Sequence, residues 1–120
     1  MTLILPFPPS VNRIWRTVQG RIILSAVGRK YRQDVAVAVH QSNVVPFGAN
    51  RIDVLIELYE PDRRRRDIDN VPKALFDALQ AARVFDDDSQ VDMMLVARRG
   101  VDRANPRVEV TIKGNSQEGV

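Results

Sequence analysis

The pattern of apolar and polar residues is clearest in the middle of the chain, where it has a period of two. Every second residue from 52 to 58 is a branched aliphatic, and the residues that alternate with them are Asp53, Leu55, Glu57 and Tyr59. Because successive side chains of a strand point to opposite faces, this segment is predicted to be a β-strand buried on one face. A turn-forming cluster at residues 46–50 precedes the strand, and Pro61 ends it.

Two other segments repeat apolar residues at helical spacing. The first helix is predicted over residues 26–42, directly after Ser25, which is a good N-cap residue. The second is predicted to begin at Asp69 or Asn70, because both cap helices well and Pro72 is tolerated in a first turn. The apolar positions of these two helices are Tyr31, Val35, Ala38 and Val39 in the first and Val71, Leu75, Ala78, Leu79 and Ala82 in the second.

The remaining apolar runs are shorter and predict flanking strands. Residues 3–5 form one strand, which ends at a proline-rich segment, and residues 21–24 form another after a loop. Two more strands are predicted at residues 91–99 and 107–113, joined by a turn, and residues 114–120 have the composition of a flexible tail. Without an internal repeat or linker, we expect one α+β domain over residues 1–113, with a small mixed β-sheet and two long helices.

Length and composition exclude several classes of protein. The chain has 120 residues, 44% of them hydrophobic and 28% charged, which suits a single globular domain. It has no apolar run of the roughly 20 residues that a membrane helix needs and no signal-peptide pattern, so we expect a cytoplasmic protein with no membrane partner. It contains no cysteine and only one histidine, His40, which argues against disulfides, thiolate nucleophiles and the common zinc sites.

The positive charge of the chain is carried mainly by arginine. The net charge is +3 and the pI is about 9.8, and only Lys30, Lys73 and Lys113 are lysines. Arginine binds phosphate through two parallel hydrogen bonds, so the predominance of arginine over lysine is compatible with a nucleic-acid substrate. A basic pI also occurs in many proteins that bind no nucleic acid, so the charge alone decides nothing.

Four consecutive arginines at residues 63–66 run directly into a pair of carboxylates, Asp67 and Asp69, and acids recur at residues 86–88. Carboxylates that would repel one another suggest a bound cation, and hard ions such as Mg²⁺ take one or two carboxylates together with waters and phosphates. The neighbouring arginines are suited to those phosphates. The pattern therefore predicts a metal-dependent enzyme that acts on a polyphosphate, with nucleic acid as the expected substrate.

The two acidic clusters flank the second predicted helix, one at each end. A helix of about a dozen residues separates its ends by about 18 Å, so the clusters meet only if the tertiary fold returns the later loop to the arginine loop. Lys73 follows Asp69 by four residues, so both occupy one face of the helix and the ammonium group can point toward the carboxylates.

The ordered set of motifs resembles the RusA family of Holliday-junction resolvases over essentially the whole chain. The residues that carry the resemblance are Leu-Pro-Phe-Pro-Pro-Ser-Val-Asn at 5–12, Asp-Arg-Arg-Arg-Arg-Asp-Ile-Asp-Asn at 62–70, Lys73, Phe-Asp-Ala-Leu at 76–79 and Asp-Asp-Ser-Gln-Val at 87–91. The sequence departs modestly from the family at Ile68 and Pro72 and in the extra acid Asp86. Pro72 could shift the start of the helix and with it the reach of Lys73.

The resemblance implies a homodimeric endonuclease, bacterial or phage-encoded, that uses Mg²⁺ or Mn²⁺ to cut two opposed strands of a four-way DNA junction. It implies that Asp67, Asp69 and Asp88 are catalytic metal ligands and that Lys73 is needed for cleavage. It also implicates the arginine run in DNA binding, and we expect contacts from Arg63, Arg64, Arg65, Arg66, Asn70 and Arg13.

Simpler roles compete for several of these residues. Asp67 and Asp69 could only cap the helix, and Asp87 is as consistent with a structural role as with metal binding. Asp86 is predicted to be a turn residue and Asp77 a helical partner of Lys73.

The arginine run could be a solvated loop, in which case about half of its members would reach phosphate, with Arg66 the first candidate. For Trp15 and Phe7, stacking on a splayed base and burial in a dimer interface both remain open.

Two other functions fit the same residues. A metal nuclease of this scaffold could act on flaps, forks or RNA, and a non-enzymatic nucleic-acid binder could use its acids only to balance the arginines. The full set of Asp67, Asp69, Lys73 and Asp88 argues against the second.

Overall fold

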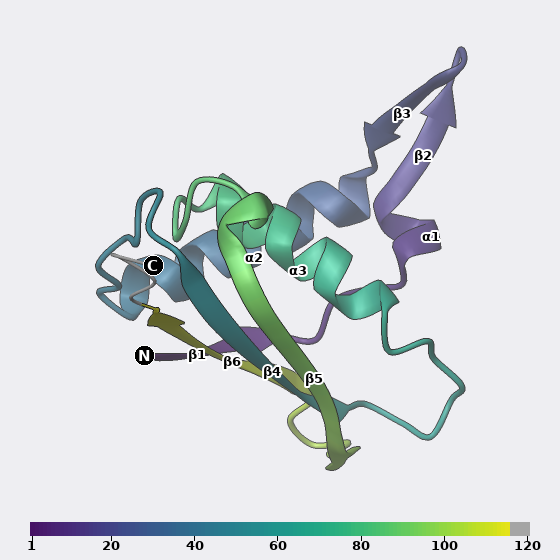
Figure 1. Cartoon of the computed structure of the whole chain (residues 1–120). Coiled ribbons are helices and arrows are strands. Elements are labelled where there is room, and N and C mark those ends of the chain that lie inside the picture. The colour runs from purple at the N-terminus through teal and green to yellow at the C-terminus, as the bar shows by residue number, and fades with distance from the viewer. Residues whose placement is uncertain (116–120) are drawn as a thin grey trace.

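The computed structural model describes residues 1–115 and shows one mixed sheet, a separate hairpin and helices on one side (Figure 1). Along the chain the elements are β1 (Thr2–Pro6), α1 (Val11–Ile14), β2 (Trp15–Val18), β3 (Arg21–Leu24), α2 (Ala26–Gln41), β4 (Ile52–Glu60), α3 (Asn70–Ala81), the 3₁₀ turn η1 (Asp88–Gln90), β5 (Val91–Val101) and β6 (Arg107–Gly114). The predicted α+β class, the mixed sheet and both long helices are confirmed.

The main sheet has the strand order β1-β6-β4-β5. β4 pairs antiparallel with β6 and parallel with β5, so that Ile56 lies between Val110 and Val96. β5 and β6 are consecutive in sequence, yet β4 lies between them, and the predicted turn after β5 therefore crosses the end of β4. The amide of Asp102 in this turn donates to the carbonyl of Glu60, 2.8 Å away.

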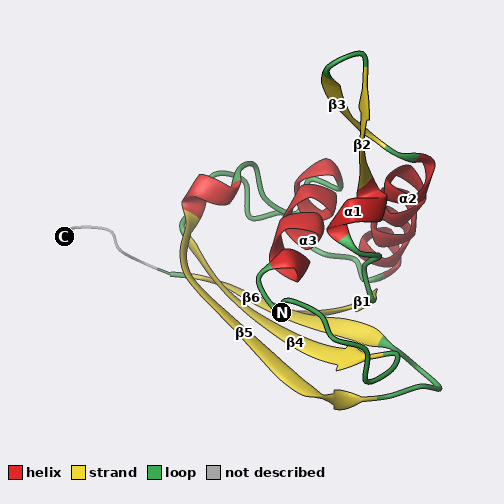
Figure 2. Cartoon of the chain, turned by 90° about the vertical axis from the view of Figure 1, so that its right-hand side faces the viewer, coloured by secondary structure: helices red, strands yellow, loops and turns green. Residues whose placement is uncertain are grey.

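Helices α2 and α3 cover one face of the sheet, as Figure 2 shows. The buried face of β4 carries the aliphatic residues of the predicted alternation, which confirms it. Leu75 and Leu79 of α3 and Val35 of α2 are fully buried against them, and Ala82 packs at the margin. The sheet edge at β5 is less well covered and exposes four large apolar side chains, Met93, Met94, Leu95 and Val101.

The predicted loop before residue 21 is wrong, since residues 11–18 form α1 and then β2. β2 pairs with β3 through a two-residue turn, Gln19-Gly20, in which both residues have positive φ angles of 52° and 77°. Such turns match the twist of a hairpin. The hairpin stands away from the sheet and the helices (Figures 1 and 2). The predicted strand at residues 21–24 is confirmed as β3, whereas β2 was missed because four residues give little alternation to detect.

The root of the hairpin is tied to the start of α2. Ser25 caps α2 as predicted, because its hydroxyl oxygen accepts from the amide of Gly28, 3.1 Å away. The Ser25 amide donates to the carbonyl of Ile14 at 2.7 Å. A Cβ atom at Gly28 would lie 2.7 Å from that same carbonyl oxygen, so only glycine allows this close approach.

The end of the described chain is more ordered than the tail prediction implies. Gly114 is the last residue of β6, and the Asn115 side-chain amide donates to Asp53 and Asp92 at 2.8 Å each. Residues 116–120 of the predicted tail lie outside the described residues. Within residues 1–115, no helix has the length and apolar character to cross a membrane.

Candidate active site

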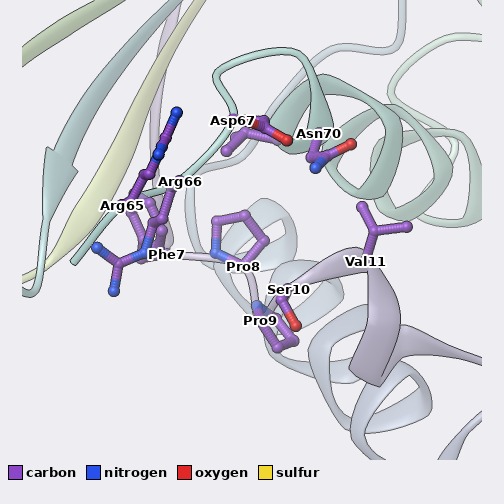
Figure 3. Close-up of a pocket in the computed structure, with 10 residues that line it drawn as sticks. Phe7, Pro8, Pro9, Ser10, Val11, Arg65, Arg66, Asp67 and Asn70 are labelled. Atoms are coloured by element: carbon purple, nitrogen blue, oxygen red, sulfur yellow. The ribbon is translucent and has the colours of Figure 1, made fainter.

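A cavity of about 450 Å³ lies where the loop after β1 meets the loop between β4 and α3. Both loops leave the same end of the sheet, because Pro6 pairs with Arg107 and Arg107 pairs with Tyr59. The lining residues are Phe7, Pro8, Pro9, Ser10, Val11, Arg65, Arg66, Asp67, Asn70 and Val71. In Figure 3, Asp67 and Asn70 lie on the α3 side of the cavity, opposite the prolines and Ser10. The fold thus joins the two most specific motifs of the sequence.

The proline-rich wall of the cavity is fixed by a hydrogen bond from α2. The hydroxyl of Tyr31 donates to the carbonyl of Pro6 over 2.8 Å. Burial, followed by the charge of Asp34, raises the pKa of Tyr31, so the hydroxyl remains a donor at physiological pH. Phe7, which the sequence left unassigned, packs on the core and lines the cavity.

Arg66 is engaged within the protein. Its Nη1 lies 2.9 Å from Asp62 Oδ1 and 3.4 Å from Glu60 Oε2, and its guanidinium lies 5.6 Å from the centre of the Phe7 ring. The same Nη1 also donates to two main-chain carbonyls of the loop. The Arg66 guanidinium holds the pKa of the Asp62 carboxyl below its ordinary value, with help from the Arg64 amide. Arg66 therefore fixes the loop to the end of β4, a structural role that competes with the predicted phosphate contact.

Glu60 and Arg98 complete this anchor, and sequence reasoning missed both. Glu60 is only 8% exposed, and its Oε1 lies 3.1 Å from the Nε of Arg98. Arg98 also donates to the main-chain carbonyl of Arg66. A signal was present in the sequence, because the alternation of β4 places Glu60 on the buried face, where a charge needs partners.

The other three arginines of the run differ from Arg66. Arg63, Arg64 and Arg65 are exposed, and within residues 1–115 they form no ion pair. Arg65 also lines the cavity beside Asp67. Arg65 is therefore better placed than Arg66 for phosphate.

Asp67 and Asp69 are exposed and take part in no ion pair within the described chain. Asp69 occupies the N-cap position of α3, but among the described residues its side chain makes no capping hydrogen bond. Capping therefore does not account for the Asp69 carboxylate, and Asp67 lies two residues too early for that position. Both carboxylates are therefore available to a ligand, although only Asp67 lines the cavity.

Asp88 lies at the far end of α3. The 12 residues of this helix span about 18 Å, and Figure 1 shows the arginine loop at one end and the turn before β5 at the other. Buried Gln90, which sequence reasoning also missed, fixes that turn by accepting from the amides of Asp86 and Asp87 and donating to Gly48 and Asn50. In the described part of one chain, no three acidic or histidine side chains converge as they would around a metal ion.

The other acids of the turn have structural roles. Asp87 caps η1 and accepts hydrogen bonds from the hydroxyl and amide of Ser89, which lower the pKa of its carboxyl. Asp86 lies in the bend before η1, as predicted. Asp77 does not pair with Lys73: its two oxygens accept from the Nε and Nη2 of Arg32 at 2.8 and 2.7 Å. That prediction was wrong because the packing of α2 on α3 supplies a bidentate partner.

Lys73 is exposed and lines a second cavity of about 480 Å³, together with Val11, Asn12, Trp15 and Ile22. Val11 lines both cavities, so the two are neighbours. Arg13 is exposed on α1 but is not among the residues that line either cavity. The first cavity thus offers the carboxylate of Asp67 and the amide of Asn70 beside the guanidinium of Arg65, and the exposed carboxylate of Asp69 lies two residues further along the chain. Such groups are suited to a divalent cation and a phosphate.

Comparison with known proteins identifies the family of the chain. The family described as Endodeoxyribonuclease RusA matches residues 6–113. The crossover junction endodeoxyribonuclease RusA of Escherichia coli K12 is 41% identical over 111 residues, which cover 92% of each chain. The proteins of that name from the enterobacterial phages 82 and HK97 are 44% identical over 108 residues, covering 90% and 89%, and 39% identical over 95 residues, covering 79% of each. The chain therefore belongs to the RusA family of endodeoxyribonucleases.

Proposed function

We propose that this chain is a structure-selective endonuclease that resolves four-way DNA junctions by metal-dependent hydrolysis of phosphodiester bonds in two opposed strands. The observation that carries the proposal is the cavity in which Arg65, Asp67 and Asn70 come together. The relatives named crossover junction endodeoxyribonuclease support a four-way junction as the substrate.

The residues at the cavity fit a Mg²⁺ ion, with Mn²⁺ as the expected substitute. Mg²⁺ keeps several waters and takes one or two carboxylates from the protein, and Asp67 and Asp69 supply two exposed ones. Asp88 is the proposed third ligand. When bound, such an ion supplies charge neutralisation at the scissile phosphate and a more acidic water.

The protein side chains would perform the remaining steps. Arg65 would hold a phosphate next to the one that is cut, and Asn70 would orient it through its amide. Lys73, one helical turn further on, would stabilise charge that develops on the leaving oxygen. Phe7 and the prolines after it would limit the access of bulk water to this side of the site.

Two copies of the chain are proposed to act together. One chain carries one Asp67–Asp69 pair and a junction has two strands to cut, so paired incision calls for a two-fold dimer. Because α3 holds Asp88 away from that pair, the third carboxylate at each site would come from the second copy.

The edge strand β5 is the proposed contact. Its backbone is unpaired on one side and its exposed apolar side chains need cover. Antiparallel pairing with the β5 of a second copy would place the start of one strand beside the end of the other. Asp88 precedes the start, and Arg98 near the end contacts the residue before Asp67. The pairing would therefore bring Asp88 of one copy toward Asp67 of the other.

The test is cleavage of a labelled synthetic junction with and without Mg²⁺, compared with a flap, a fork and an RNA hairpin. We expect symmetric nicks in two opposed strands of the junction, only with the metal. Preferred cutting of the flap or RNA would favour the other nuclease function. Binding to the junction without any metal-dependent nick would favour a non-enzymatic binder.

A further inference from the structure

The hairpin β2–β3 has two faces of different chemistry. Paired residues of an antiparallel ladder share a face, and faces alternate along each strand. The register Trp15 to Leu24 and Thr17 to Ile22 therefore places these four side chains on one face. The other face carries Arg16, Val18, Arg21 and Ile23. Trp15 and Ile22 line the second cavity, so the first face is the one turned toward α3.

Ile22 is 73% exposed although it belongs to this inner face. A hairpin of two short strands has no core of its own with which to cover such a side chain. Ile22 and Trp15 form an apolar wall, and Asn12 and Lys73 add polar groups to the same cavity. A ligand that fits must be flat or apolar on one side and carry polar groups and negative charge on the other.

Charge indicates what kind of ligand this is. Residues 11–24, which form α1 and the hairpin, include Arg13, Arg16 and Arg21 and no acid. Within residues 1–115 these three arginines form no ion pair, and all three are exposed. A projecting arm with this charge suits a polyanion. The charge alone does not disfavour an acidic or apolar protein surface as the main partner; for that, the apolar wall must also have a role in binding the polyanion.

The position next to the active-site cavity supplies that use. Val11 belongs to both cavities, and Lys73 lies three residues after Asn70 on α3. A strand whose phosphate lies at Arg65 and Asp67 would bring an adjacent nucleotide to the hairpin. Bases stack on aromatic side chains whatever their identity, and a base leaves its own stack most easily where pairing is already interrupted. The centre of a four-way junction is such a place.

We propose that the cavity under the hairpin binds one unstacked nucleobase of the strand to be cut. The base would lie against Trp15 and Ile22, Asn12 would hydrogen-bond to its edge, and Lys73 would contact the neighbouring phosphate. The cavity would thereby favour a junction over continuous duplex before any bond is broken. The inference rests on the proposed function for the identity of the strand, and it concerns binding rather than cleavage.

The test uses Trp15, the one tryptophan of the chain, as a probe. The full-length protein is titrated in EDTA with an unlabelled junction and with linear duplex, and the bound fraction is measured separately by anisotropy of labelled DNA. We expect the junction to quench Trp15 fluorescence and duplex at equal saturation to leave it unchanged. Equal quenching by both, or none by the junction, overturns the proposal.

Two variants on one strand supply the matched comparison. Ile22→Ser removes one of the two side chains of the apolar wall, and Ile23→Ser makes the same change on the opposite face, where the side chain is 38% exposed. We expect Ile22→Ser to lower the ratio of junction to duplex affinity about tenfold, because the base no longer buries an aliphatic side chain, and Ile23→Ser to leave it unchanged. Equal effects of the two would show that the hairpin acts only through its charge.

The readouts also separate this inference from the proposed function. If junction DNA quenches Trp15 but is never cut, the inference about the base cavity holds and the proposed nuclease function is wrong. If junctions are cut while Trp15 fluorescence does not change, the proposed nuclease function holds and the inference about the base cavity is wrong. If Ile22→Ser instead abolishes dimerisation in sedimentation, the inner face contacts a second copy of the chain and the proposal is wrong.

Discussion

At the scale of single residues, the structure separates charges that act within the protein from charges that are available to a ligand. Arg66 is 23% exposed at its side chain and ion-paired, whereas Arg65 is exposed at the cavity. Asp87 is bound to Ser89, whereas Asp67 and Asp69 have no such partner among the described residues. Contiguous residues of one type therefore have different roles, because neighbours in a loop face different ways.

Asp67→Asn and Asp69→Asn should each reduce junction cleavage by more than about 100-fold, since even the groups that support metal ligands are worth about 10–100-fold. Junction binding should persist or tighten, because a carboxylate repels phosphate. Thermal stability should stay unchanged, since both side chains are exposed and unpaired within residues 1–115. Cleavage assays, anisotropy and thermal melts check the three statements.

Asp86→Asn is the control for these variants, because it removes an exposed acid outside the proposed ligand set. Wild-type cleavage by either Asp67→Asn or Asp69→Asn would remove that residue from the site.

Arg66→Ala should affect the stability of the protein, whereas Arg65→Ala should affect DNA binding. Arg66→Ala leaves buried Glu60 with Arg98 as its one remaining ion-pair partner in the described chain and should lower stability by about 1.5–3 kcal/mol, the contribution of a hydrogen bond to a charged group. Arg65→Ala should leave stability unchanged and reduce the slope of log K against log salt by about 0.9, one phosphate contact. Chemical denaturation and salt-dependent binding measure the two effects.

A second readout concerns Asp62. Its pKa is lowered mainly by Arg66, so its contribution to loop stability is present above the ordinary carboxyl pKa and is lost as the pH falls through the lowered value. In Arg66→Ala the pKa of Asp62 should rise toward its ordinary value, which carboxyl NMR titration can follow. An unchanged pKa of Asp62 would show that Arg66 does not hold the loop.

At the scale of elements, the position of the hairpin depends on one close contact. α1, β2, β3 and the start of α2 meet around Gly28, where the main chains approach too closely for a side chain. This contact determines the direction in which the hairpin leaves the body, and with it the width of the cavity beside Lys73.

Gly28→Ala should therefore lower stability by about 1–3 kcal/mol, the usual cost of overpacking, because the new Cβ would lie 2.7 Å from both Ile14 O and Leu24 Cδ1. Junction preference should fall with it, since the hairpin root must move. Gly114→Ala is the control, because nothing lies within 4 Å of a Cβ atom at that position. Equal melting temperatures for the two variants would contradict the packing argument.

At the scale of the whole molecule, strand order determines which functional groups can meet. β4 and β5 are parallel, so the segment before β5 lies near the start of β4, whereas the arginine loop follows its end. A nine-residue strand spans roughly 30 Å, and α3, about 18 Å long, covers the return distance together with the loops at its two ends. Within one described chain, Asp88 and Asp67 therefore lie at opposite ends of α3.

Mixing two inactive variants tests the assembly directly. In a dimer of one Asp67→Asn chain and one Asp88→Asn chain, one composite site would carry both substitutions and the other would have both carboxylates intact. We expect the mixture to regain nicking of one strand per junction, since about half of the dimers become mixed after free exchange of a two-fold dimer. Continued inactivity of mixed dimers, confirmed by mass spectrometry, would place all three acids in one chain.

Local sequence determined most of the elements and indicated the candidate site residues. The alternation from Ile52 to Leu58, the Ser25 cap and the start of α3 near Asn70 are local signals, because each depends on the backbone geometry of a few consecutive residues. The motif at residues 62–70 likewise indicated the family that the comparison confirms. The meeting of that motif with Phe7 and Pro8, the partners of Glu60 and Asp77, and the separation of Asp88 were decided by the tertiary structure. These features depend on strand order and helix packing, which bring together residues far apart in sequence and leave no local pattern to read.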